Sequence, residues 1–255
     1  MDAVHKIVAV NYSNTFPFVY GIEKSGLMEA YDLQLLHPVG CAEAFISGEA
    51  DIALLPVGAL NLLPEHHIIT DMCIGAVQQV KSVLLVSHKP LQEIKSIALD
   101  TESATSVRLC KVLAANFWNI APRFQAVQVK NHADFPEMDA FVVIGDKAFE
   151  LAPRFEYGYD LAEEWFKFTG LPFVFAVWVS QPDVNLVLIR KLNAALHYGV
   201  DHIPEVVEHF REQFHGNFDL TYYLTKSIDY RFDEMKKKSL EKFMGYVAKG
   251  FQKLF

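Results

Sequence analysis

Short apolar runs alternate with segments of helical spacing over the first 56 residues, and this alternation restricts the fold more than any other feature of the sequence. A strand, a helix and a further strand in succession are typical of a parallel sheet, because the helix supplies the crossover that parallel pairing needs. Strands are predicted at residues 7–10, 33–36 and 51–55, and helices at residues 17–26 and 41–47. The sequence therefore predicts an α/β fold with helices on the faces of the sheet.

A second alternating series begins after a turn near residues 87–90. Its strands are predicted at residues 97–99, 124–129 and 140–144, and a helix through Val107 lies between the first two. Two such series, joined by two crossovers, predict two lobes with a ligand cleft between them.

Apolar runs outside the two series complete the predicted sheets. Residues 68–74 and 82–86 are β-rich, and the run Phe173–Val179 is predicted to be a buried strand that returns to the first lobe. The remaining C-terminal part is predicted to be helical. We expect each lobe to be a mixed, mostly parallel sheet flanked by helices. The predicted first lobe is discontinuous, with residues 1–88 and 175–255, and the second holds residues 89–174.

The bulk properties argue against several classes of protein. The formal net charge is −8 and the isoelectric point is near 5.7, which disfavours nucleic acid as a partner. Three cysteines without C-x-x-C spacing argue against a disulfide framework or a zinc site. The N-terminus lacks the pattern of a secretory leader, and no apolar run reaches transmembrane length. We therefore expect a cytoplasmic protein that binds neither a membrane nor a metal.

Four hydroxyl side chains crowd the junction between the strand at residues 96–99 and the helix that follows it. They are Thr101, Ser103, Thr105 and Ser106. Backbone amides at the start of a helix attract anions, and hydroxyl groups add further hydrogen-bond donors. The junction therefore predicts a carboxylate or phosphate site, while helix capping alone remains an alternative.

Two other strands also end in polar residues. Asn11–Thr15 follows the first strand, and Gly145 and Asp146 follow the strand at residues 140–144. Because open α/β sheets bind ligands beyond the carboxyl ends of their strands, these ends are expected to converge with the hydroxyl-rich junction on one cleft. Asn14 as a helix cap and Asp146 as a helix-start residue are the structural alternatives.

Several blocks, in order and at the expected spacing, resemble the chorismate dehydratase family of the futalosine route to menaquinone. The resemblance covers residues 7–180, and its blocks are VNYSNTFP (10–17), GEADIALLP (48–56), KSVLLVS (81–87), SATSVRL (103–109), IGDKA (144–148), DLAEEW (160–165) and GLPFVFAVW (170–178).

The resemblance implies a two-lobed fold like that of type 2 periplasmic binding proteins and an enzyme without a cofactor. It implies that chorismate is the substrate and that the product is 3-[(1-carboxyvinyl)oxy]benzoate. Asn14 and Ser82 correspond to the catalytic Asn and Ser of the family. Thr105, Ser106, Gly145 and Asp146 correspond to residues of the substrate cleft. Many relatives carry Ser where Val57-Gly58 stands here, so a substrate contact from that position is in doubt.

Chorismate has two carboxylates, so its enzyme needs anion sites. We expect Ser103, Thr105 and Ser106 to bind one carboxylate, and Asn14 and Ser82 to hydrogen-bond near the reacting carbons. The blocks contain no evident strong base. The proton acceptor is therefore either a carboxylate of the substrate or Asp146.

Two other functions share the implied fold. A solute-binding protein for small anions is one, although such a protein is normally exported. The other is 1,4-dihydroxy-6-naphthoate synthase of the same pathway, whose base is a His in the cleft. No His lies in the blocks at the strand ends here. The oligomeric state, monomer or homodimer, stays open.

Overall fold

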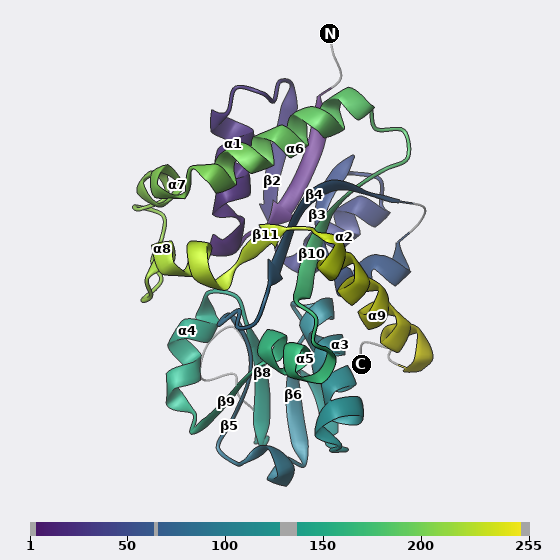
Figure 1. The fold of residues 1–255 in the computed structure, drawn as a ribbon, viewed down its shortest axis with the longest axis vertical. Coiled ribbons are helices and arrows are strands. Elements are labelled where there is room, and N and C mark those ends of the chain that lie inside the picture. Colours follow the sequence, from purple (N-terminus) through teal and green to yellow (C-terminus); the bar gives the residue numbers. More distant parts are fainter. Residues whose placement is uncertain (1–3, 64–65, 128–136, 251–255) are drawn as a thin grey trace.

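Two mixed β-sheets lie end to end along the long axis of the molecule (Figure 1). The computed structural model describes residues 4–63, 66–127 and 137–250. Among these, β-strands of both sheets alternate with helices along the chain, as the apolar periodicity predicts. The α/β class is therefore confirmed.

The first sheet has six strands in the order β11-β4-β10-β3-β1-β2. Parallel pairing joins β1 to β2 and β3, whereas β10 pairs antiparallel with β3 and β4, and β11 pairs antiparallel with β4. The strands are β1 (His5–Val10), β2 (Tyr31–Leu36), β3 (Ile52–Pro56), β4 (His67–Ala76), β10 (Phe173–Ser180) and β11 (Asp229–Arg231).

The second sheet has five strands in the order β7-β6-β8-β5-β9. Parallel pairs join β6 to β7 and β8, and antiparallel pairs join β5 to β8 and β9. The strands are β5 (Val83–Ser87), β6 (Ser96–Asp100), β7 (Arg123–Val127), β8 (Ala140–Ile144) and β9 (Tyr157–Asp160). The predicted strand at residues 124–129 runs past β7 at residues 128 and 129, which lie outside the described residues.

Three sequence-based expectations need correction. The predicted first lobe extends to residue 88 and includes Val83–Ser87, but this strand pairs with β8 and β9 in the second sheet. The chain therefore crosses between the sheets at residues 77–82. Parallel pairs do not outnumber antiparallel pairs among the described strands. The C-terminal part is not helical throughout, because Asp229–Arg231 forms β11. An apolar run shows that a strand forms but not which distant strand it pairs with.

The helices pack against the sheets and against one another. Helix α6 contacts α1 and β4, α2 contacts β1 and β3, and α9 contacts β10 and α3. Their bounds are α1 (Phe16–Lys24), α2 (Pro38–Ile46), α3 (Ala104–Leu113), α4 (Lys147–Leu151), α5 (Leu161–Thr169), α6 (Leu186–Asp201), α7 (Ile203–His209), α8 (Leu220–Tyr222) and α9 (Glu234–Gly250). No helix in the described part of the chain is both long enough and apolar enough to span a membrane.

Aromatic packing joins α5 and β10, where the chain returns to the first sheet, to the C-terminal helix α9. Trp165 of α5 is fully buried and meets Phe173 of β10 and Phe243 of α9 edge to face. Its indole Nε1 donates a hydrogen bond of 2.9 Å to the Ser239 hydroxyl of α9. Edge-to-face pairs of this kind stabilise a core beyond the area that they bury. Helix α5 is therefore anchored to the first sheet although it follows a strand of the second.

Two glycines allow α1 and α6 to cross with their backbones in contact. A Cβ atom on Gly199 would lie 1.7 Å from the carbonyl oxygen of Pro17, and one on Gly21 would lie 1.9 Å from that of Ala195. Both obstacles are backbone atoms, which cannot rotate away as a side chain can. The close crossing sets the position of α1, whose preceding turn carries Asn14.

We predict that Gly199→Ala lowers the free energy of unfolding by about 3 kcal/mol, because the added methyl group overlaps a backbone carbonyl. Gly245→Ala is the matched control, since Gly245 also lies inside a helix but a Cβ there meets no atom within 4 Å. The control is expected to raise stability by about 0.5–1 kcal/mol through helix propensity. Urea unfolding of both variants tests this, and equal stabilities would contradict it.

Candidate functional site

A small pocket, here called the central pocket, lies between the two sheets and has a volume of about 60 Å³. Six of the seven predicted site residues line it, namely Asn14, Ser82, Ser103, Thr105, Ser106 and Gly145. The rest of its lining is Val10, Tyr12, Pro38, Pro56, Ile74, Val80, Val83, Ile144, Phe175 and Ala176. Ligand pockets for small molecules usually enclose about 300–1,000 Å³, so a ring-shaped ligand requires the groups around this pocket to move apart.

A line of buried hydrogen bonds joins Asn14 to Ser82 through Tyr223. The Asn14 amide nitrogen donates to the Tyr223 hydroxyl at 3.4 Å, and that hydroxyl donates to the Ser82 Oγ at 2.7 Å. The Asn14 Oδ1 accepts from the Thr15 hydroxyl at 3.3 Å, and Tyr230 donates to the Asn14 carbonyl oxygen at 3.0 Å. Because Ser82 accepts from Tyr223, its own hydroxyl proton is left to donate into the pocket.

Tyr223 occupies the start of a π-helical turn, Tyr223–Ser227, in the C-terminal part of the chain. Its ring packs edge to face against Phe149 and Phe218. Burial raises the pKa of the Tyr223 hydroxyl well above its usual value, with the hydrogen bonds to Ser82 and from Asn14 acting in the opposite direction. Tyr223 therefore stays protonated at neutral pH and acts as a donor to Ser82.

The hydroxyl groups at the start of α3 have different partners. The Ser103 Oγ caps the helix by accepting from the Ser106 amide at 3.2 Å, and it donates to the Ser106 Oγ at 2.9 Å. The Ser106 hydroxyl thus ends a short chain of donors and can donate to a ligand. Capping and ligand binding, which the sequence left as alternatives, are compatible here.

Thr105 connects the two sheets. Its hydroxyl donates to the carbonyl oxygen of Phe175 at 3.1 Å and accepts from the amide of Gly58 at 3.0 Å. A Cβ on Gly58 would lie 2.6 Å from the Cα of Thr105, so only glycine allows this approach. Gly58, the second residue of the Val57-Gly58 pair named above, therefore contacts the other lobe.

Asp146 does not line the central pocket. Its carboxylate accepts from the Ser13 amide at 3.1 Å and from the Ser13 hydroxyl at 2.6 Å, which ties α4 to the turn after β1. Burial raises the pKa of Asp146, and the two bonds from Ser13 partly offset this. Asp146 was expected among the residues of the substrate cleft. It instead lies next to the pocket, where it binds Ser13 and follows the lining residue Gly145.

Gly145 and Tyr12 form one wall of the pocket. Gly145 has a φ of 67°, and a Cβ there would lie 2.6 Å from the Tyr12 ring. The buried Tyr12 hydroxyl has no hydrogen-bond partner among the described residues, and burial together with nearby Glu102 and Asp100 raises its pKa. It is therefore a protonated donor that a ligand can satisfy.

All described residues that line the central pocket are uncharged. Lys147, which lies nearby on α4, pairs with the buried Asp100 at 2.7 Å and with Glu102 at 2.9 Å. An anion in this pocket would be held by hydroxyl groups, the Asn14 amide and the dipole of α3 rather than by a cationic side chain.

Sequence reasoning missed Tyr223 and Tyr230, and it named Val57-Gly58 only as a position where a substrate contact is in doubt. No local signal marks the two tyrosines, which lie in a segment whose aromatic residues mostly pack in the core. The sequence also does not show that Gly58 contacts Thr105. Only the fold brings these three residues to Asn14, Ser82 and Thr105.

Comparisons with known proteins place the chain among known sequences and folds. A sequence profile of the family described as menaquinone biosynthesis matches residues 5–249. A chorismate dehydratase from Thermus thermophilus is 28% identical to this chain, and the match covers 77% of this chain and 78% of that protein.

Solved structures show the same fold. A protein from Archaeoglobus fulgidus superposes with a TM-score of 0.74 at 14% identity, over 96% of this chain and 97% of that chain. A Candida albicans protein described as having the generic periplasmic binding protein fold superposes with a TM-score of 0.64 at 12% identity, over 97% and 91% of the two chains. The expected periplasmic-binding-protein-like fold is confirmed, and such low identities indicate nothing beyond the fold.

We predict that Tyr223→Phe lowers kcat by about tenfold to a hundredfold without unfolding the protein, because the ring packing stays while the bond that orients Ser82 is lost. Tyr222→Phe removes the same atom from the preceding, half-exposed residue and is expected to leave kcat unchanged. Steady-state kinetics with the substrate proposed below distinguish the two, and equal kcat values for both variants would contradict the role of the Tyr223 hydroxyl.

Proposed function

This chain belongs to the menaquinone biosynthesis family, and we propose that it is a chorismate dehydratase, a hydro-lyase that converts chorismate to 3-[(1-carboxyvinyl)oxy]benzoate and water. The observation that carries the proposal is the line Asn14–Tyr223–Ser82 at the wall of an uncharged pocket between the lobes. The similarity to the Thermus thermophilus chorismate dehydratase supports the same substrate.

The pocket offers donors for a dicarboxylate at two places. The Ser106 hydroxyl and the start of α3 lie on one side, and the unpartnered Tyr12 hydroxyl lies near Gly145. We assign one substrate carboxylate to the Ser106 hydroxyl and the α3 dipole, with Ser103 orienting Ser106 through its own hydrogen bond. In this assignment the Thr105 hydroxyl holds the lobes together rather than binding substrate, because Gly58 and Phe175 already occupy it.

The reaction requires one C–O and one C–H bond of the ring to break on neighbouring carbons. The C–H electron pair becomes the third double bond of an aromatic ring, the hydroxyl leaves with the C–O pair, and hydroxide and proton together make one water. Aromatisation supplies the driving force, so the protein needs mainly to orient the ring and to stabilise the departing oxygen. Ser82, whose proton is directed away from Tyr223, donates to that oxygen, and Asn14 orients the enolpyruvyl arm or the same oxygen.

The proton acceptor in this proposal is a carboxylate of the substrate. The described lining residues include no Asp, Glu, His or Lys. Asp146 is turned toward Ser13 with both oxygens. The lack of a lining His also disfavours the naphthoate synthase alternative, which needs a His base in the cleft.

We predict that the purified protein, without added metal or nucleotide, converts chorismate to a product lighter by one water. Asn14→Ala and Ser82→Ala are each expected to lower kcat by about a hundredfold or more, because each removes a hydrogen bond near the reacting carbons. Ser47→Ala, at an exposed position, is the control. Ultraviolet absorbance and mass spectrometry measure the product.

The same experiment separates the alternatives. Binding of chorismate without turnover would favour a small-anion-binding protein of this fold. If chorismate is neither bound nor converted, the proposal is overturned, and later intermediates of the pathway become the next compounds to assay.

We predict that Asp146→Asn retains kcat within about tenfold of the wild type, because the Asn oxygen can accept from the Ser13 amide while its NH₂ group donates to the Ser13 hydroxyl, which can also accept. Removal of a general base costs about 10²–10⁴-fold, so the two roles differ measurably. A loss in that larger range, with normal unfolding in urea, would identify Asp146 as the base and contradict the substrate-carboxylate mechanism.

A further inference from the structure

Asp160 is a buried carboxylate at the junction of β9 and α5 that binds four backbone amides. Its Oδ1 accepts from the amides of Ala162 at 3.0 Å and Glu163 at 3.2 Å, in the first turn of α5. Its Oδ2 accepts from the amides of Val80 at 3.0 Å and Lys81 at 2.7 Å, in the crossover between the sheets. One oxygen thus caps a helix, and the other holds a segment that lies about 80 residues earlier in the chain.

The held segment leads directly into the site. Val80 lines the central pocket, and Ser82 follows Lys81. Lys81 has a φ of 65°, a left-handed conformation that a residue with a side chain adopts only when its surroundings enforce it. The bonds from Asp160 hold this conformation, which turns the chain so that the Ser82 Oγ meets the Tyr223 hydroxyl.

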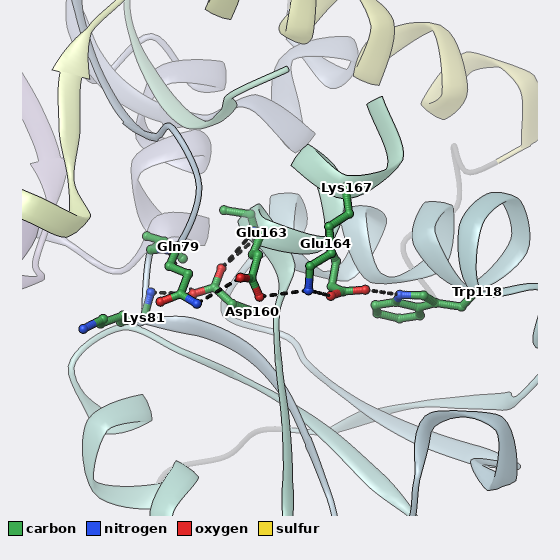
Figure 2. A network of polar contacts seen from close by, with 9 residues as sticks. Gln79, Lys81, Trp118, Asp160, Glu163, Glu164 and Lys167 are labelled. Atoms are coloured by element: carbon green, nitrogen blue, oxygen red, sulfur yellow. Dashed lines mark hydrogen bonds and ion pairs between the residues drawn. The ribbon is translucent and has the colours of Figure 1, made fainter. Parts of the chain in front are cut away.

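Neighbouring side chains reinforce the connection between the crossover and α5 (Figure 2). Gln79 donates from Nε2 to the Glu163 carboxylate at 3.0 Å, and Lys167 binds Glu163 at 3.1 Å and Glu164 at 2.8 Å. Glu164 in turn accepts from the Trp118 indole at 2.7 Å. The start of α5 is thereby fixed from two sides, and Asp160 presents its second oxygen from a rigid support.

We propose that Asp160 is a positioning residue, which holds Ser82 in line with Tyr223 through the backbone of Val80 and Lys81; this inference rests on the proposed function of Ser82. Asp160 does not line the central pocket, so it acts through that backbone and not on the substrate. Burial raises the pKa of Asp160 to about 6 despite the opposing effect of the four amides, so the ionised form predominates at neutral pH. An ionised acceptor makes the stronger bonds to amides.

The two oxygens allow the capping and positioning roles to be separated. Asparagine caps helices as well as aspartate does, so Asp160→Asn keeps the Oδ1 contacts to Ala162 and Glu163. Its NH₂ group then faces two N–H donors at Val80 and Lys81 and repels them. Asp139→Asn is the matched control, because the Asp139 Oδ2 also accepts from two consecutive amides, those of Lys95 and Ser96, in the same sheet and away from the pocket.

The first measurement is kinetic, on folded variants with chorismate as substrate. We expect Asp160→Asn to lower kcat by about tenfold to a hundredfold with a much smaller change in KM, as for a displaced catalytic group, and Asp139→Asn to leave both unchanged. In a Ser82→Ala background, Asp160→Asn is expected to cause no further loss of kcat, because the hydroxyl that Asp160 positions is already absent. Equal fold-losses in the two backgrounds would overturn the proposal.

A rescue variant and a measurement that is independent of turnover complete the test. Lys81→Gly removes the conformational cost of the left-handed φ, so it is expected to restore part of the kcat lost in Asp160→Asn. Hydrogen exchange at the amides of residues 79–82 is expected to rise in Asp160→Asn and not in Asp139→Asn. Unchanged exchange would refute the positioning role of Asp160 even if chorismate is turned over. If the wild type leaves chorismate unchanged but Asp160→Asn speeds exchange, the proposed function fails while Asp160 still holds the backbone of Val80 and Lys81.

Discussion

The hydroxyl of Tyr223 is the point on which the organisation of the site depends. It accepts from Asn14 and donates to Ser82, and so it joins a turn near the N-terminus, the crossover between the sheets and the C-terminal segment. Two other features of the fold support the ends of this line. The crossing of α1 and α6 at Gly21 and Gly199 sets the turn of Asn14, and the Asp160 contacts lie behind Ser82. Because burial keeps Tyr223 protonated, the direction of donation toward Ser82 is set as well.

Hydrogen bonds between described residues join the lobes around the central pocket. Ser13 binds Asp146, Tyr223 binds Ser82, and Thr105 binds the backbone of Gly58 and Phe175. A hydrogen bond between neutral groups contributes about 0.5–1.5 kcal/mol net and one to a charged group about 1.5–3 kcal/mol, so this set can be exchanged for bonds to water when the cleft opens. Since the pocket of about 60 Å³ is smaller than a ring substrate needs, binding and release depend on such an opening.

This protein must recognise a dicarboxylate without electrostatic attraction from its net charge. The net charge is −8, and the described lining of the pocket has no charged side chain. Hydroxyl donors and the dipole of α3 act at short range, whereas a cationic pocket would attract anions of many kinds. Such a site selects by the positions of its donors, which is consistent with a reaction that needs orientation more than charge.

The local sequence pattern by itself determines the order of strands and helices and the polar character of the strand ends. The alternation of strands and helices, the hydroxyl-rich start of α3 and the polar strand ends at Asn14 and Gly145 all follow from the sequence, because periodicity and capping act over a few residues. The local pattern does not determine which strands pair. Val83–Ser87 looks like any apolar strand, and only its pairing with β8 and β9 assigns it to the second sheet. Thr105 lines the central pocket as expected, but its hydroxyl is also bound to the backbone of Gly58 and Phe175 in the other lobe. Asp146 lies next to the pocket, and its carboxylate binds Ser13. Tyr223 and Asp160 acquire their roles from partners 141 and about 80 residues away, and such long-range contacts arise only when the whole chain packs.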